Sequence, residues 1–373
     1  MHIETEILYR LSIALVAALA ISFLMTPIVM KMAYKVGAID VPKDARRMHT
    51  HPIPRLGGFA IFLGFVISVL FFADIDRQLQ GILLGAVIIV IIGVIDDITP
   101  LPALFKFAVQ IIAAIVVVCH GVVIETIANP NIFSSSEYIS FGIWAYPITV
   151  IWIVAVTNSV NLIDGLDGLA VGVSTIAAVS MLIIALIVAP GNLTIVLAAL
   201  VGACVGFVPY NKNPAKIFMG DTGALFLGFI LATVSVVGLF KYYAVITFVV
   251  PFIILGLPIF DTAFAFFRRL LKGQSPMKPD RKHFHHRLID MGLSQKQAVM
   301  FLYLISAIMG VAAIVMTTSG DIRALIVIGT FIVVGIIVYF IKEKHEPKEP
   351  LPASDDSQKS DDSEDKNGSP DKS

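Results

Sequence analysis

The chain has 373 residues, of which 57% are apolar and 14% are charged. Soluble domains carry about 25% charged residues, so the composition excludes an ordinary soluble protein. The mean hydropathy of +0.88 indicates a membrane protein along most of the length. The formal net charge is zero, and we expect no nucleic-acid partner.

Eleven apolar segments are candidate membrane-spanning helices, each of which needs roughly 20 apolar residues. The predicted fold class is therefore an all-α polytopic membrane protein with about eleven transmembrane helices, forming one domain over residues 1–341. The predicted segments are 8–30, 56–74, 80–95, 102–120, 144–160, 168–189, 193–210, 223–240, 243–268, 298–318 and 321–341.

Lysine and arginine residues predict the orientation of these helices, because cytosolic loops carry an excess of both. The loop 31–55 and the loop after the ninth segment are rich in these residues, and Lys212 and Lys216 lie between the seventh and eighth segments. Eleven alternating helices place all of them on one side. The pattern predicts that the N-terminus is outside the cell and the C-terminus is in the cytosol.

Two stretches differ from the apolar helices. Residues 121–143 form the only long loop expected outside, and their β-branched pieces on either side of N-P-N-I-F-S-S-S predict a small β-hairpin. Residues 342–373 contain six lysines and ten acidic residues without an aromatic side chain. This composition cannot bury a core and predicts a disordered acidic cytosolic tail.

The polar clusters fall at the ends of the segments that are predicted to face the cytosol. They are Asp96 and Asp97 after the third segment, the N-S-V-N-L-I-D-G-L-D-G stretch 158–168, Asp221 before the eighth segment, and a histidine group after the ninth. Ionisable groups at membrane depth cost a few kcal/mol each and are usually functional. Their convergence on one face predicts a site there.

Each cluster also has a purely structural reading. Adjacent carboxylates at the C-terminal end of a helix oppose the helix dipole and require a cation, so we favour a functional role for Asp96 and Asp97. Asp164, Asp167 and Asp221 could act as helix N-caps. Two caps three residues apart, each followed by a glycine, are less plausible than one cap and one ligand-binding carboxylate. The histidines could be ordinary loop residues.

The combination of side chains points to phosphoryl transfer. Carboxylates suit a hard cation such as Mg²⁺, which binds one or two of them together with substrate phosphates. Histidine and the neighbouring cations suit phosphate oxygens, and glycine-rich turns before helices offer backbone N–H groups to the same anions. Zinc is a weak rival, because H-x-H-H occurs here without a cysteine set or an H-E-x-x-H pattern.

Five motifs in order give the chain a specific resemblance over about residues 20–340. It resembles the polyprenyl-phosphate N-acetylhexosamine-1-phosphate transferases, of the glycosyltransferase family 4 type. The motifs are P-I-P-R-L-G-G (52–58), D-D (96–97) with L-P-A-L-F-K-F-A-V-Q following, N-S-V-N-L-I-D-G-L-D-G-L-A (158–170), F-M-G-D-T-G-A-L-F-L-G (218–228) and H-F-H-H-R-L (283–288).

The resemblance implies a Mg²⁺-dependent enzyme that moves a sugar 1-phosphate from a UDP-sugar to undecaprenyl phosphate and releases UMP. The active site would lie at the cytosolic face of a bacterial plasma membrane, and the enzyme would be a homodimer. A second pKa near 6 makes much of a phosphate monoester dianionic already, so charge neutralisation can matter more than a catalytic base. A two-step route through a phospho-aspartate on Asp96 or Asp97 is the mechanistic alternative.

The resemblance also assigns residues. Asp221, Asn161 and Asp97 would form the metal site, Asp96 would be the base, and Lys106 would contact a phosphate. The remaining site residues would bind substrate or take part in catalysis beside the phosphate and sugar: Arg55, Asn158, Asp164, Asp167, His283, His285 and His286.

The donor sugar is predicted from the same motifs. The pentapeptide branch of the family typically has three consecutive histidines, whereas H-F-H-H and the Arg55 motif resemble the GlcNAc branch. We therefore expect UDP-GlcNAc as the donor and an envelope polymer, wall teichoic acid first among them, as the final product. The alternatives are a phospho-MurNAc-pentapeptide transferase and a transporter of anions. Transporter sites lie near the midplane, which fits one-sided acidic clusters poorly.

Overall fold

A computed structural model describes residues 5–42, 51–128, 138–188, 190–242, 249–271, 273, 283–318 and 329. These residues form α-helices, one short 3₁₀ helix and two short antiparallel strand pairs. The helices are α1 (Thr5–Val36), α2 (Gly58–Phe72), α3 (Arg77–Ile98), α4 (Ala103–Cys119), η1 (Gly142–Trp144), α5 (Ala145–Ile163), α6 (Leu169–Val188), α7 (Asn192–Asn211), α8 (Gly220–Tyr242), α9 (Val249–Ile254), α10 (Gly256–Leu271), α11 (Phe284–Asp290) and α12 (Gln295–Thr318).

The structure confirms an all-α polytopic membrane protein. Seven helices of the described part are long and apolar enough to cross a membrane, and α2 and α4 are shorter apolar helices. The first eight predicted segments coincide with α1–α8 and the tenth with α12. The eleventh segment, 321–341, and the tail, 342–373, lie outside the described residues except for position 329, so the count of eleven and the orientation stay predictions.

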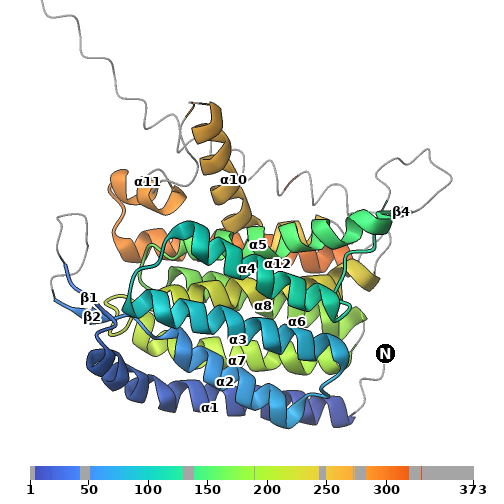
Figure 1. The fold of residues 1–373 in the computed structure, drawn as a ribbon, viewed down its shortest axis with the longest axis horizontal. Coiled ribbons are helices and arrows are strands. Elements are labelled where there is room, and N and C mark those ends of the chain that lie inside the picture. The colour runs from blue at the N-terminus through green and yellow to red at the C-terminus, as the bar shows by residue number, and fades with distance from the viewer. Residues whose placement is uncertain are drawn as a thin grey trace, which may run out of the picture.

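Most of these helices lie side by side, with α8 among them at the centre of the bundle (Figure 1). The central apolar stretch of α8 is 89% buried, more than that of any other candidate span. Glycine allows the closest helix contact: Gly202 and Gly206 of α7 lie on one face, four residues apart, and a Cβ there would come within 2.1 Å and 2.4 Å of carbonyl oxygens of α1. These glycines therefore bring α7 directly against α1.

The predicted ninth helix, 243–268, is not one continuous helix. Residues 243–248 lie outside the described part, and the remainder forms α9 and α10 with a break at Leu255. Gly256 and Pro258 follow the break, as expected for residues that interrupt a transmembrane helix. As a result α10 stands out from the bundle at a steep angle to the other helices, and α11 lies beside it (Figure 1).

The two strand pairs lie at opposite ends of the bundle (Figure 1). The predicted hairpin within 121–143 is present as β3 (Thr126–Ala128) and β4 (Tyr138–Ser140), with Ile127 opposite Ile139. The other pair, β1 (Ile39–Asp40) and β2 (Ile53–Pro54), was not predicted. Strands of two or three residues leave too short a pattern in the sequence to be recognised.

Candidate active site

The first turn of α8 is fastened by the carboxylate of Asp97. Its two oxygens accept hydrogen bonds from the backbone N–H groups of Asp221 (2.9 Å) and Thr222 (3.0 Å), and from the Thr222 hydroxyl (2.6 Å). The Arg55 guanidinium donates to the same carboxylate at 3.1–3.2 Å. The Asp97 side chain has no exposed surface. It thus caps α8 and ties that helix to the segment that carries Arg55.

Glycines allow the backbone of residues 54–58 to lie against the start of α8. The N–H groups of Gly57 and Gly58 donate to the carbonyl oxygens of Phe218 (3.0 Å) and Met219 (2.8 Å). A Cβ at Gly58 would lie 2.0 Å from the nitrogen of Gly223. Gly220 has a φ of +70°, and a Cβ there would lie 2.4 Å from an oxygen of Asp97. Only glycine fits these positions.

A second carboxylate cluster surrounds Lys106. Its ammonium nitrogen lies 3.0 Å from Oδ2 of Asp96 and 2.6 Å from Oδ2 of Asp221. The other oxygen of Asp96 accepts the N–H of Leu101 at 2.8 Å, and Oδ1 of Asp221 lies 3.3 Å from Nδ2 of Asn161. Side chains from α3, α4, α5 and α8 thus meet at one point.

The D-G-L-D-G turn between α5 and α6 is held by the loop after α7 and by α12. One oxygen of Asp167 accepts from Nδ2 of Asn213 and from the N–H of Ala215, both at 3.0 Å. Asn211 accepts the N–H of Gly168 at 3.1 Å, and the Tyr303 hydroxyl donates to the Gly168 carbonyl at 2.5 Å. The turn is therefore fixed by hydrogen bonds to two other segments, and Asp164 at its start lines the cavity described below.

The histidine segment packs against the same turn. The ring of His285 is 2% exposed and lies so close to Gly165 that a Cβ there would come within 2.2 Å of its Nε2. His283 stacks on His285, with ring centroids 5.8 Å apart and an angle of 7° between the ring planes. The ring centroids of His285 and His286 are 4.3 Å apart. Asp261 of α10 pairs with His283 at 3.0 Å.

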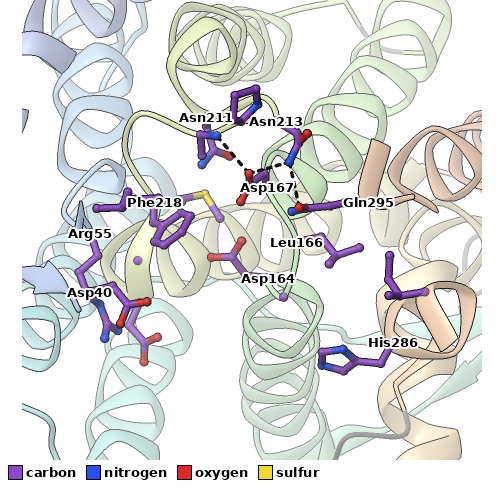
Figure 2. Close-up of a pocket in the computed structure, with 18 of the residues that line it drawn as sticks. Asp40, Arg55, Asp164, Leu166, Asp167, Asn211, Asn213, Phe218, His286 and Gln295 are labelled. Carbon is purple, nitrogen blue, oxygen red and sulfur yellow. Dashed lines mark hydrogen bonds between the residues drawn. The ribbon is translucent and has the colours of Figure 1, made fainter. Parts of the chain in front are cut away.

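These elements enclose a cavity of about 760 Å³, within the range of small-molecule sites. Figure 2 shows Arg55 and Asp40 on one side, His286 on the other, and Asp164 and Asp167 between them. The lining residues are Asp40, His51, Ile53, Arg55, Asn161, Asp164, Gly165, Leu166, Asp167, Asn211, Asn213, Pro214, Ala215, Phe218, Met219, Gly220, Asp221, His286, Ile289, Asp290 and Gln295.

Two groups in or behind the cavity wall have shifted protonation equilibria. Burial, with the nearby charge of Asp221 as a second cause, raises the pKa of Asp164 to about 8. Burial lowers the pKa of His285 to about 3, and the adjacent His286 acts in the same direction. Near pH 7 both Asp164 and His285 are therefore neutral in the free protein.

Asp221 and Asn161 are the residues best suited to hold a divalent cation. Turning the Asn161 amide by half a rotation places its oxygen beside Oδ1 of Asp221. One carboxylate and one amide oxygen match the few protein ligands that Mg²⁺ takes when substrate phosphates complete its shell. The described residues contain no group of three or more His, Cys, Asp or Glu side chains suited to a metal. A site completed by phosphate oxygens therefore fits the described residues, and a cage of protein ligands alone does not fit them.

Comparison with known proteins decides the family. A probable undecaprenyl-phosphate N-acetylglucosaminyl 1-phosphate transferase of Bacillus subtilis is 40% identical over 349 residues, which is 92% of this chain and 96% of that protein. The model for glycosyl transferase family 4 matches residues 79–239. The chain belongs to glycosyl transferase family 4.

Two further family 4 relatives are similar over most of their length. A decaprenyl-phosphate N-acetylglucosaminephosphotransferase of Mycolicibacterium smegmatis is 32% identical, covering 90% of this chain and 89% of that protein. An undecaprenyl-phosphate alpha-N-acetylglucosaminyl 1-phosphate transferase of Thermotoga maritima is 31% identical, covering 76% and 91%. The family match spans α3–α8 and so contains the Lys106 cluster and the D-G-L-D-G turn.

The structure brings most of the predicted site residues together. Arg55, Asn161, Asp164, Asp167, Asp221 and His286 line the cavity, and Asp96, Asp97 and Lys106 reach it through contacts with Asp221 or its backbone.

Three predicted residues lie behind the cavity wall. Asn158 donates to Gln110 and to the carbonyl of Val154 and does not line the cavity. His285 and His283 are buried, and neither lines the cavity.

Several cavity residues of this family 4 chain were not predicted from the sequence. Asn211 and Asn213 belong to a polar Y-N-K-N-P stretch at the same predicted face as the acidic clusters, which was a usable signal. Asp40 and Gln295 gave none, because Asp40 ends a two-residue strand and Gln295 is one of several polar residues at the start of α12. Only the fold shows that they border the site.

Proposed function

We propose that this chain transfers GlcNAc-1-phosphate from UDP-GlcNAc to undecaprenyl phosphate, releasing UMP and forming undecaprenyl-diphosphate-GlcNAc. The observation that carries the proposal is the meeting of Asp221, Asn161 and Lys106 at the wall of a polar cavity. An anion transporter has no evident use for that arrangement, and the B. subtilis and T. maritima relatives are named for an activity of the proposed kind.

The donor nucleotide is proposed to occupy the cavity. Arg55 places positive charge at one end, beside the buried Asp97. Phe218 is the only Phe, Tyr or Trp among the described residues that line this cavity, and it offers an aromatic face for a base. Asp164 is neutral near pH 7 and can donate a hydrogen bond to the nucleotide without repelling its phosphates.

The chemical step is proposed as a single displacement. An oxygen of the lipid phosphate attacks the β-phosphorus, the bond from that phosphorus to the oxygen of the α-phosphate breaks, and UMP leaves. Lys106 stabilises the charge that spreads over the phosphoryl oxygens. Mg²⁺, when bound by Asp221 and Asn161, would neutralise the pyrophosphate and orient it.

The surroundings of the two adjacent aspartates favour this route over a phospho-aspartate. Both oxygens of Asp97 are bonded to Arg55 and the start of α8, and its side chain has no exposed surface. The oxygens of Asp96 are bonded to the N–H of Leu101 and to Lys106. Asp97 thus supports the metal site from behind, and Asp96 holds Lys106.

The placement in the cell is part of the same proposal. The lysine- and arginine-rich loops support a cavity that opens to the cytosol of a bacterium, where UDP-sugars and the phosphate end of the lipid meet. The product would start an envelope polymer such as wall teichoic acid, and the enzyme would act as a homodimer, as the family resemblance implies.

The test is UMP release by the purified protein in detergent with undecaprenyl phosphate and Mg²⁺. UDP-GlcNAc, UDP-GalNAc and UDP-MurNAc-pentapeptide are compared, with Asp221→Asn as the inactive variant. Asp76→Asn is the matched control, because Asp76 caps α3 through the N–H of Leu79 and does not line the cavity. We expect release with UDP-GlcNAc alone, retained in Asp76→Asn and lost in Asp221→Asn. UMP release only with the pentapeptide donor would show that the sugar assignment is wrong. No UMP release by the folded protein with any of the three donors would show that the proposed reaction is wrong.

A further inference from the structure

Asp261 of α10 uses both carboxylate oxygens to hold the start of α11. Oδ2 lies 3.0 Å from Nδ1 of His283, and Oδ1 accepts the backbone N–H of Phe284 at 2.8 Å. A carboxylate only accepts hydrogen bonds, so the proton of His283 is on Nδ1. Both side chains are less than a tenth exposed, at 8% for His283 and 7% for Asp261. One residue therefore fixes both the ring of His283 and the first N–H of α11.

The helix held in this way carries the histidines that reach the D-G-L-D-G turn. The His283 ring stacks on that of His285, and His285 fills the space beside Gly165. His286, the next residue, lines the cavity. A shift of α11 would therefore move His285 off the turn and His286 out of the wall.

A second described contact between α10 and α11 is weaker. The Arg287 guanidinium lies over the Phe264 ring, 5.5 Å from its centroid, and Phe264 is half exposed. Such a contact is worth little at an exposed site. The buried carboxylate with its two short hydrogen bonds is thus a stronger tie than this cation–π contact between the helix that leaves the bundle and the helix that bears the histidines.

We propose that Asp261 is a positioning residue for the reaction: it holds the H-F-H-H segment against the D-G-L-D-G turn, so that His286 faces the nucleotide cavity. The expected effect of Asp261 on activity rests on the proposed function. Its expected effect on the position of the histidines rests on geometry alone. Asp261 does not line the cavity, so it acts through α11 and not on the substrate.

The experiment measures two quantities in the full-length protein. The first is carbethoxylation of individual histidines by diethylpyrocarbonate, read by tandem mass spectrometry, with the exposed His51 as the internal standard. Both ring nitrogens of His285 are buried without a hydrogen-bond partner, so it should react slowly in the wild type. The second quantity is the kinetics of UMP release with UDP-GlcNAc.

The variants separate positioning from general stability. Asp261→Ala removes both hydrogen bonds, whereas Asp261→Asn keeps the shape and an oxygen for the N–H of Phe284. Asp76→Ala also removes an aspartate that holds a helix start, but at α3 and away from the cavity. It controls for the loss of a cap anywhere in the bundle.

We expect Asp261→Ala to raise the reactivity of His285 toward that of His51 and to lower kcat/KM for UDP-GlcNAc by roughly ten- to a hundredfold, as loss of an orienting partner commonly does. Asp261→Asn should give values of both quantities, His285 reactivity and kcat/KM, between those of Asp261→Ala and the wild type. If the alanine variant does not fold, Asp261→Asn is used for the test. Asp76→Ala should leave His285 protected and the activity unchanged.

Other results have definite meanings. If His285 is as well protected from diethylpyrocarbonate in both Asp261 variants as it is in Asp76→Ala, Asp261 does not have the positioning role. Exposure of His285 with unchanged UMP release would also overturn it, because the position of α11 would then not matter for the reaction. A third outcome is that the wild type releases no UMP, while His285 is protected in the wild type and reactive in the Asp261 variants alone. This outcome would overturn the proposed function and leave the tie between Asp261 and α11 established.

Discussion

The ammonium nitrogen of Lys106 lies 2.6 Å from Oδ2 of Asp221, so a lysine of α4 neutralises the carboxylate on which the proposed metal site depends. The same nitrogen lies 3.0 Å from Asp96. The proposed metal position is beside the other oxygen, Oδ1, so the ammonium group and a metal ion on Asp221 would repel each other across one carboxylate. In the free protein the lysine therefore competes with a metal ion for the charge of Asp221.

The Lys106→Met variant should separate metal affinity from activity. Without the competing ammonium group, Asp221 should bind Mn²⁺, used as a spectroscopic substitute for Mg²⁺, several-fold more tightly. UMP release should fall on the order of 10²-fold, because a positive charge aimed at the phosphoryl oxygens is lost. Electron paramagnetic resonance titration of free Mn²⁺ measures the first effect.

Lys216→Met is the control for Lys106→Met, because it removes an exposed lysine from the loop before α8. It should leave both quantities near the wild-type values. Equal or weaker Mn²⁺ binding in Lys106→Met would contradict the competition between the lysine and the metal.

Asp97 should matter for the stability of the folded protein as much as for catalysis. Asp97→Ala leaves Arg55 and the first N–H groups of α8 without their buried partner. Breaking a buried pair typically costs about 3–5 kcal/mol of unfolding free energy. The unfolding midpoint in detergent should drop markedly. Asp74→Ala, which breaks an exposed pair with Arg10, should change it little. A similar midpoint for both variants would show that Asp97 does not anchor α8.

Binding of UDP-GlcNAc should weaken at alkaline pH because of Asp164. Its pKa is raised to about 8, so it carries a proton and donates a hydrogen bond below that pH, and becomes a negative charge beside the pyrophosphate above it. KM for UDP-GlcNAc, measured from pH 6.5 to 9, should therefore rise as pH passes about 8. Asp164→Asn cannot ionise and should show a flat profile. The same alkaline rise in Asp164→Asn would assign the effect to another group.

Gly58→Ala should disrupt the start of α8. A Cβ there would lie 2.0 Å from the Gly223 nitrogen, a backbone atom that cannot move aside alone. We expect little folded protein and no UMP release. Gly238→Ala, farther along α8, would meet only Cδ2 of Leu193 at 2.4 Å, the end of a flexible side chain. Size-exclusion profiles and UMP release compare the two. Equal behaviour would mean that the close approach at Gly58 is not required.

The sequence by itself determined the membrane class, most helix positions and most of the residues that meet at the candidate site. In a bilayer the backbone N–H and C=O groups of an apolar run of about 20 residues find partners only in a helix or a closed barrel. The positions of α1 to α8 and α12 could therefore be predicted from the apolar runs alone. Asp96, Asp97, Asp164 and Asp221 were recognisable because carboxylates are costly and rare in such runs. The motif order then pointed to the family that the comparisons establish.

Only the tertiary structure decided which of these side chains face the cavity and which support it from behind. Asp97 and Asp221 look alike in the sequence, yet one caps α8 with no exposed surface and the other lines the cavity. The break of the ninth segment turns α10 out of the bundle, and Asp261 then meets His283 across 22 positions of the chain. Such contacts depend on the directions of the helices and on the close approaches that glycines allow. Both are set by packing between distant segments, which produces no periodic pattern in the sequence.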